Sequence, residues 1–300
     1  MSFKNALKNL VAHFGTVWSL LLFILLFAAL ITGLSLPFVM PIAREFADAG
    51  VFNLLRQAFS ALLGDGGWNA MWDKLYETYD AIVGVFTEND WMATLTTSFL
   101  IVVVVLAFRF FLGLYEIPIT TVLDGQMSCN AHYGLGGKFF STLPVAARYS
   151  FAKMLFTILF DVVTGAIING LYMLIGVSVA LPFVIMLVGL VLYSLRFSIV
   201  SCWAPIVVSE GGKVAKSFFA AAKLCFKKFA SIYSTYFVSL LLIVALGLFI
   251  SVFTLGVGLV IVFPFCATYI SHLNITVFYN KTGRRYYVDG SVFTPPLVSL

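Results

Sequence analysis

Long, almost uninterrupted apolar stretches dominate the pattern of this chain. A helix needs about 20 mostly apolar residues to cross a bilayer, and six stretches meet that requirement. They lie at residues 16–40, 91–115, 154–176, 179–204, 231–253 and 257–279. The pattern therefore predicts an all-α polytopic membrane protein with six transmembrane helices, organised as a single membrane domain over residues 1–300.

The segments between these spans are amphipathic helices or short turns. In-plane helices are predicted at 1–15, in the loop 116–153 and at 205–230, and residues 280–300 form a tail. The segment 41–90 contains two amphipathic helices divided at 64–67, with apolar residues at helical spacing in the second. Residues 176–179 are expected to form a tight hairpin turn between the third and fourth spans.

Composition and charge exclude a soluble globular domain and give the chain an orientation. Hydrophobic residues make up 61% and charged residues only 10%, with a mean hydropathy of +1.03, whereas soluble domains carry about a quarter charged residues. Thirteen Lys and Arg residues fall in segments on one side, and eight acids fall in 41–90 on the other. The positive-inside rule then places both termini in the cytosol. A signal peptide is the alternative interpretation of the first stretch.

Part of the chain is repeated. Residues 136–154 and 211–229 are identical at seven of nineteen positions at an offset of 75. Upstream of each copy, an Arg-Phe pair precedes a Pro-Ile pair by nine residues, at Arg109 and Pro118 and again at Arg196 and Pro205. Three copies of a unit made of an in-plane helix, an ascending span and a descending span are expected, the first of them faint.

The second copy carries a resemblance. Arg196, Pro205, the turn 210–212 and the helix 215–229, with the tail TVFYNKTGRRYYVD, resemble uncharacterised six-helix bacterial membrane proteins. That family is similar to the membrane domain fused to some glycerophosphodiester phosphodiesterases. The resemblance covers roughly residues 100–290. It implies the fold, the topology and a bacterial plasma membrane, and it carries no catalytic residues. The acidic segment 41–90 departs from the family pattern.

One in-plane helix has a basic stripe. Its lysines lie opposite a row of Ala and Phe side chains, as in helices that lie in the headgroup plane. The stripe consists of Lys213, Lys216, Lys223 and Lys227. Binding of anionic lipid headgroups is one interpretation, and enforcement of topology alone is the other. Membrane lipids are the expected partners, nucleic acid is not, and no protein partner is predicted.

Three charged residues fall well inside the spans, where ionisable side chains are candidates for function. Asp161 and Arg196 are equidistant from the turn at 176–179 and should therefore lie at one level and form an ion pair. Arg109 should lie in the same plane, because it precedes its exit proline by the same nine residues as Arg196 does. A permanent clasp between two spans and a proton- or anion-responsive site are the alternatives.

The cytosolic half of the sixth span is polar. Thr268, His272 and Asn274 are candidates for lining a pathway, although such residues more often bond to neighbouring helices. Enzyme motifs, metal-ligand spacings and cofactor-binding patterns were not found, so no cofactor, metal site or catalysis is expected. The leading hypothesis is a non-enzymatic scaffold or accessory component in envelope or lipid homeostasis. The alternative is a small transporter or permease subunit with a pathway through the pseudo-symmetric bundle.

Overall fold

The structure is a computed structural model that describes residues 2–63, 67–88, 91–131, 133–176, 180–211, 213–254, 256–288 and 291–295. The expected turns at 64–67 and 176–179 lie partly outside the described residues. Helices account for 89% of the described residues, which confirms the all-α class. Six of them are long and apolar enough to cross a membrane, as predicted.

Eleven helices and two short strands follow one another in the described part of the chain. The elements are α1 (Ser2–Ala12), α2 (Gly15–Asp48), α3 (Val51–Leu63), α4 (Gly67–Glu88), α5 (Trp91–Cys129), α6 (Leu135–Ile175), α7 (Leu181–Val200), α8 (Trp203–Glu210), α9 (Val214–Lys227), α10 (Phe229–Thr254), α11 (Leu259–Thr282), β1 (Tyr286–Val288) and β2 (Ser291–Phe293). The candidate spans lie in α2, α5, α6, α10 and α11 and in the stretch Leu181–Glu210, which joins α7 and α8.

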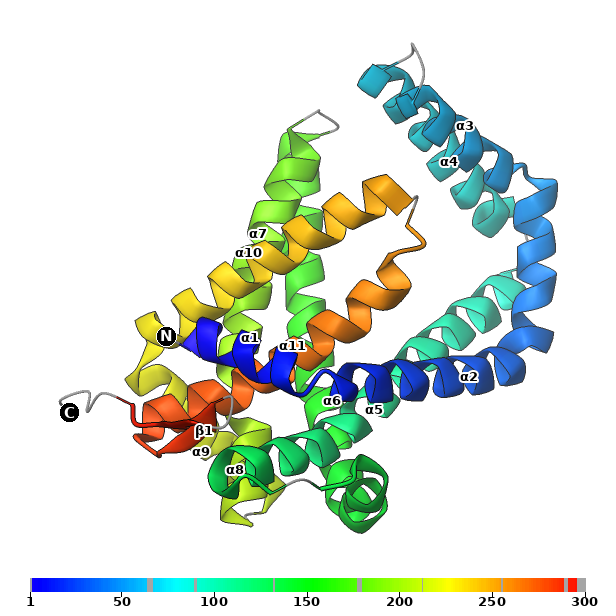
Figure 1. The fold of residues 1–300 in the computed structure, drawn as a ribbon. Coiled ribbons are helices and arrows are strands. Elements are labelled where there is room, and N and C mark those ends of the chain that lie inside the picture. Colours follow the sequence, from blue (N-terminus) through cyan, green and yellow to red (C-terminus); the bar gives the residue numbers. More distant parts are fainter. Residues whose placement is uncertain are drawn as a thin grey trace. The chain divides into compact units, whose positions relative to one another are not determined.

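The chain divides into two compact units, Leu26–Phe108 and the combination of Met1–Leu25 with Arg109–Leu300. In the first unit, α3 and α4 pack side by side as a helical hairpin (Figure 1). Val51 and Ala58 of α3 and Thr78 of α4 are buried, whereas Phe59 and Trp68 remain exposed. This hairpin therefore buries only a narrow strip of small side chains and leaves large apolar side chains on its surface.

Among the six candidate spans, α11 of the second unit is the most buried. In its most apolar window 61% of the residues are buried, against 6–22% for the other five candidate spans. α1, α8 and α10 all pack against α11 (Figure 1). The other spans keep apolar faces exposed, as expected where lipid rather than protein covers a helix.

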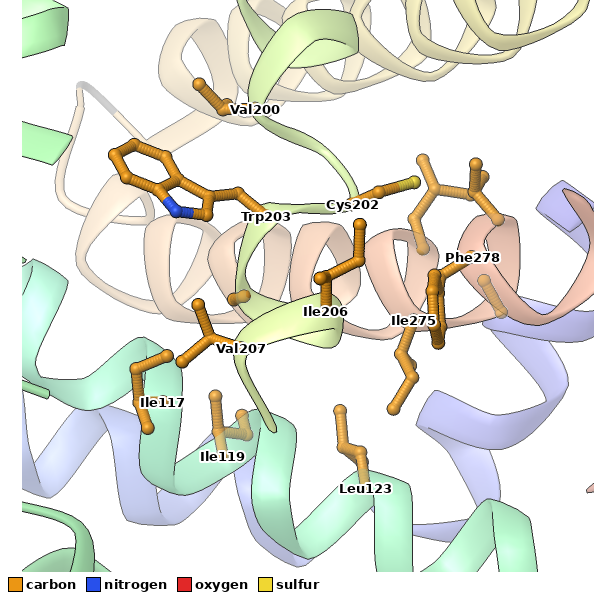
Figure 2. Close-up of a cluster of buried hydrophobic side chains, with 14 of the residues drawn as sticks. Ile117, Ile119, Leu123, Val200, Cys202, Trp203, Ile206, Val207, Ile275 and Phe278 are labelled. Atoms are coloured by element: carbon orange, nitrogen blue, oxygen red, sulfur yellow. The ribbon is translucent and has the colours of Figure 1, made fainter. Parts of the chain in front are cut away.

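The hydrophobic core lies where α5, α8 and α11 meet. Figure 2 shows Ile119 and Leu123 of α5, Ile206 of α8, and Ile275 and Phe278 of α11 gathered in this region, and all five are buried. They belong to one contiguous cluster of buried residues. The core is thus built from the halves of these helices that adjoin the lysine-rich loops.

In the first copy of the predicted repeat the helices are continuous, whereas in the second copy they are interrupted. α5 runs unbroken through Pro118 and α6 through Pro144, so the expected boundaries at 115/116 and 153/154 fall inside helices. In the second half, turn residues 201–202 separate α7 from α8, and Lys228 ends α9. A proline within a helix commonly kinks it without ending it when neighbouring groups satisfy the freed backbone.

Segments near the two ends of the chain, α1 and the region 280–286, meet in the second unit. Asn5 Nδ2 donates to the Tyr286 hydroxyl at 2.8 Å, and Asn280 Nδ2 donates to Ser2 Oγ at 2.8 Å. Tyr286 lies on the small antiparallel hairpin of β1 and β2, in which it pairs with Phe293. This hairpin was not predicted, because three-residue strands leave almost no periodic signal.

Candidate functional site

The site begins with a close approach of two spans. A Cβ atom added to Gly113 of α5 would lie 3.0 Å from Cβ of Ser150 on α6. Ser150 Oγ also donates to the backbone oxygen of Phe110 at 2.5 Å. Small residues allow membrane helices to approach closely and to form such interhelical hydrogen bonds. This contact brings the charged side chains of α5 and α6 within reach of each other.

Asp161 of α6 holds two arginines from two other helices. Arg196 Nη1 of α7 donates to Asp161 Oδ1 at 2.8 Å, and Arg109 Nη1 of α5 donates to Asp161 Oδ2. The side chains of Asp161 and Arg196 are 19% and 17% exposed, and that of Arg109 is 35% exposed. The structure therefore brings together the three intramembrane charges singled out in the sequence, with one carboxylate oxygen for each arginine.

A second ion pair lies nearby on the same two helices. Lys153 of α6 contacts Glu116 of α5, and the side chain of Glu116 is only 11% exposed. Sequence reasoning missed this pair because both residues lay in a predicted loop. The signal was present, since Glu116 follows Arg109 by seven residues and Lys153 precedes Asp161 by eight. Both intervals are about two helical turns, so each helix carries its two charges on one face.

A cavity of about 360 Å³ opens beside these charges within the second unit. Four charged side chains line it, and they are Arg109, Glu116, Lys153 and Arg196. The remainder of the wall is largely apolar, with Leu20, Phe197 and Phe263 among its members. Ligand pockets typically have volumes of about 300–1,000 Å³, mostly apolar walls and a few polar groups. The cavity has these characteristics.

The polar residues of α11 divide between two faces. Asn274 lies in the cavity wall, together with Ala267 and Ser271 at helical spacing. Thr268 and His272, four residues apart on another face, are fully buried outside the cavity lining. Among the described residues, neither ring nitrogen of His272 has a hydrogen-bond partner. The structure thus separates Asn274 from the other two candidates for a pathway lining.

A polar pair occupies the position that matches Asp161 in the second copy of the repeat. Tyr236 lies 75 residues after Asp161, and its buried hydroxyl donates to Asn274 Oδ1 at 2.6 Å. A neutral pair therefore replaces a charged cluster at this position. The two copies of the sequence repeat are therefore chemically unequal at this position.

The basic helix α9 has three faces. Ser217, Ala221 and Cys225 are buried, and burial raises the pKa of the Cys225 thiol to about 11. Phe219 and Phe226, seven residues apart, are 71% and 65% exposed. The four lysines predicted from the sequence, Lys213, Lys216, Lys223 and Lys227, are all exposed. At about 100° per residue, the row of Lys216 and Lys223 lies beside the row of exposed Phe side chains, and not opposite it as expected from the sequence.

The beginning of α9 is fixed to the bundle by Trp203. Trp203 belongs to α8, and its indole Nε1 donates to the backbone oxygen of Val214 at 2.8 Å. The indole ring also packs against the Phe218 ring, with a centroid distance of 4.8 Å. The orientation of the exposed Lys and Phe rows is therefore set by a buried anchor.

The fold and the site define the class of the protein. Within the described ranges, no three His, Cys, Asp or Glu side chains gather closely enough to hold a metal ion. The chain is a multi-pass α-helical membrane protein with a charged cluster and a cavity inside one of its two units. Comparison with protein-family models, curated proteins and solved structures gives no match.

Proposed function

We propose that the protein is a non-enzymatic component of a bacterial plasma membrane, a scaffold or accessory in envelope or lipid homeostasis, whose cytosolic face binds anionic lipid. The observation that carries this proposal is the three-faced helix α9. Its buried face holds it against the bundle, and its Lys and Phe rows are left exposed side by side. A basic helix with exposed aromatic side chains is typical of the headgroup region.

The N-terminal helix α1 supports the same interpretation. Asn5, Ala6 and Leu10 of α1 are buried, and α1 packs on α11. Lys4 and Lys8 are exposed, as are Leu7 and Val11 beside them. A second helix thus shows lysines next to exposed apolar side chains. The proposal also includes three properties expected from the sequence. They are the cytosolic position of both termini, the threefold internal repeat and the likeness to the six-helix bacterial family.

Lipid titration of the purified full-length chain tests the proposal. Phosphatidylglycerol should raise the unfolding temperature more than phosphatidylcholine does, and replacing Lys216, Lys223 and Lys227 with Gln should abolish most of the difference. Each lysine near an anionic surface contributes about 1 kcal/mol at low salt, so three should contribute about 3 kcal/mol. The effect should disappear near 1 M salt, where the Debye length is about 3 Å.

The matched control removes the same charge elsewhere. Arg44 and Arg56 are exposed and Lys74 is partly exposed, all three in the other unit. Changing these three to Gln should leave the response to phosphatidylglycerol intact. Equal responses of the two triple variants would contradict a specific role for α9.

Transport is the second candidate, and the cavity beside Arg109 and Arg196 is the observation that favours it. A cysteine at Ser271, in a chain whose four native cysteines are replaced by serine, would report which side of the membrane the cavity opens to. A transporter predicts modification by an impermeant thiol reagent from both sides. Modification from one side alone would exclude alternating access and leave the cavity as a binding site or a packing space.

A further inference from the structure

The charges around the cavity do not balance. Arg109, Lys153 and Arg196 supply three positive charges, and Glu116 and Asp161 supply two negative ones. Within the part of the chain that the structure describes, no other acidic side chain forms an ion pair with any of these three cations. An uncompensated charge in a low-dielectric setting is unfavourable. One further negative charge would neutralise the cluster.

The excess positive charge is located at the two arginines. Lys153 contacts Glu116 directly, so this pair is neutral as a unit. Arg109 and Arg196 share the single carboxylate of Asp161, each through one nitrogen. A guanidinium carries five N–H donors in a planar fork, which leaves each arginine donors beyond the bond to Asp161. Both arginines line the cavity, whereas Asp161 is not among its lining residues.

The rest of the cavity wall is suited to the acyl chain of a ligand. Leu240, Ile243 and Ile270 line it in addition to Leu20 and the two phenylalanines described above. A volume of about 360 Å³ is near the lower end of the range for small-molecule pockets. It would hold a small headgroup and the first part of a chain. A free inorganic anion would leave these apolar walls without a partner.

We propose that this cavity binds the monoanionic head of a single-chain amphiphile, a carboxylate or a phosphate carried on an acyl chain, with Arg109 and Arg196 as its ligands. The site is separate from the lysine row of α9 and does not depend on the proposed function. Arginine is suited to this role because its fork matches carboxylate and phosphate oxygens in a bidentate geometry. Ser271 and Asn274 add polar groups to the same wall.

The test counts bound molecules and measures affinities on the full-length chain in neutral detergent. Four probes are compared by native mass spectrometry and titration: palmitate, palmitoyl lysophosphatidylglycerol, palmitoyl lysophosphatidylcholine and inorganic phosphate. At least one of the two anionic amphiphiles should bind at one per chain and at least tenfold more tightly than the zwitterionic probe. The stronger of the two identifies the head as carboxylate or phosphate.

Three variants and one control then locate the site. Arg109→Gln should weaken binding at least tenfold, and Arg109→Lys should retain part of it. Ala267→Leu fills the cavity without changing any charge, and it should weaken binding to a similar degree in protein that still elutes as a folded species. Arg56→Gln removes one exposed positive charge from the other unit and should bind as the wild type does.

Three outcomes would overturn the proposal. The first is equal affinity for the zwitterionic and anionic amphiphiles. The second is inorganic phosphate binding as tightly as the amphiphiles. This result would mean that the acyl chain of the ligand contributes nothing to binding. The third is a result that places the amphiphile outside the cavity. Such a result is unchanged binding in both Arg109→Gln and Ala267→Leu, or binding that is lost only in the variant with the α9 lysines replaced.

Discussion

At the scale of single residues, Asp161 is the carboxylate on which the intramembrane cluster depends. It contacts both Arg109 and Arg196, so its removal would leave two cations facing each other without a counter-charge. Asp161→Asn should lower the free energy of unfolding by about 3 kcal/mol, near the lower end for a broken buried pair, since Arg109 is 35% exposed. Unfolding in mixed micelles with increasing dodecyl sulfate would measure the change.

The exposed pair Lys74–Glu77, at 2.6 Å, provides the control. Lys74→Gln should cost less than about 1 kcal/mol, as expected for a surface ion pair. Loss of folded Asp161→Asn protein would support a structural clasp. Normal stability accompanied by lost transport or signalling would instead support a functional site.

Tyr236 is the neutral counterpart of Asp161 in the second half. Tyr236→Phe removes the hydroxyl that donates to Asn274 at 2.6 Å and leaves the ring in place. The loss should be modest, about 0.6 kcal/mol and at most about 1.7 kcal/mol, because side-chain hydrogen bonds between membrane helices are weak on average. The same unfolding measurement with Tyr172→Phe, at an exposed position, should show no loss.

At the scale of elements, α5 and α6 approach each other closely at Gly113. Any side chain there meets the Cβ and backbone of Ser150, at 3.0 and 3.2 Å for an added Cβ. Gly113→Ala should therefore destabilise the protein by about 1–3 kcal/mol, the usual cost of overpacking. It should also separate α5 from α6 and weaken both ion pairs that link these helices.

Gly189 in the middle of α7 provides the matched control, because an added Cβ has no neighbour within 4 Å there. Gly189→Ala should be neutral or slightly stabilising, since Ala is favoured over Gly in a helix by about 1 kcal/mol. A similar loss at both glycines would mean that backbone effects, rather than the contact with Ser150, determine the result.

At the scale of the whole molecule, the four cysteines report topology and burial together. Cys129 is exposed, and Cys202, Cys225 and Cys266 are buried. An impermeant maleimide should modify one thiol per chain at pH 7, and it should do so in inside-out vesicles but not in intact cells. Modification from the outside would contradict the cytosolic position assigned to the loop after α5.

The pH dependence of labelling follows from the thiolate requirement of the reaction. Because the pKa of Cys225 is raised to about 11, only on the order of one molecule in 10⁴ is thiolate at pH 7. That fraction should rise about tenfold per pH unit up to about pH 11. Slow labelling of a second thiol should therefore accelerate about a hundredfold between pH 7 and pH 9, as measured by mass spectrometry of peptides.

Properties that depend on composition along one helix could be predicted from the sequence. The helical class and the six candidate spans follow from the length and apolarity of each stretch, because a bilayer requires both locally. The common level of Asp161 and Arg196 follows from their equal distance to one turn. The structure has these two side chains in contact at 2.8 Å.

Properties that depend on which faces meet were decided only by the tertiary structure. The pair Glu116–Lys153, the approach at Gly113 and the cavity all arise where two or more helices cross. Apolar periodicity does not specify such crossings. Within a membrane, lipid tails cover an apolar helix face as favourably as a neighbouring helix does. The sequence by itself determined where charge enters the membrane, and the packing of α5, α6, α7 and α11 decided that two arginines line a cavity there.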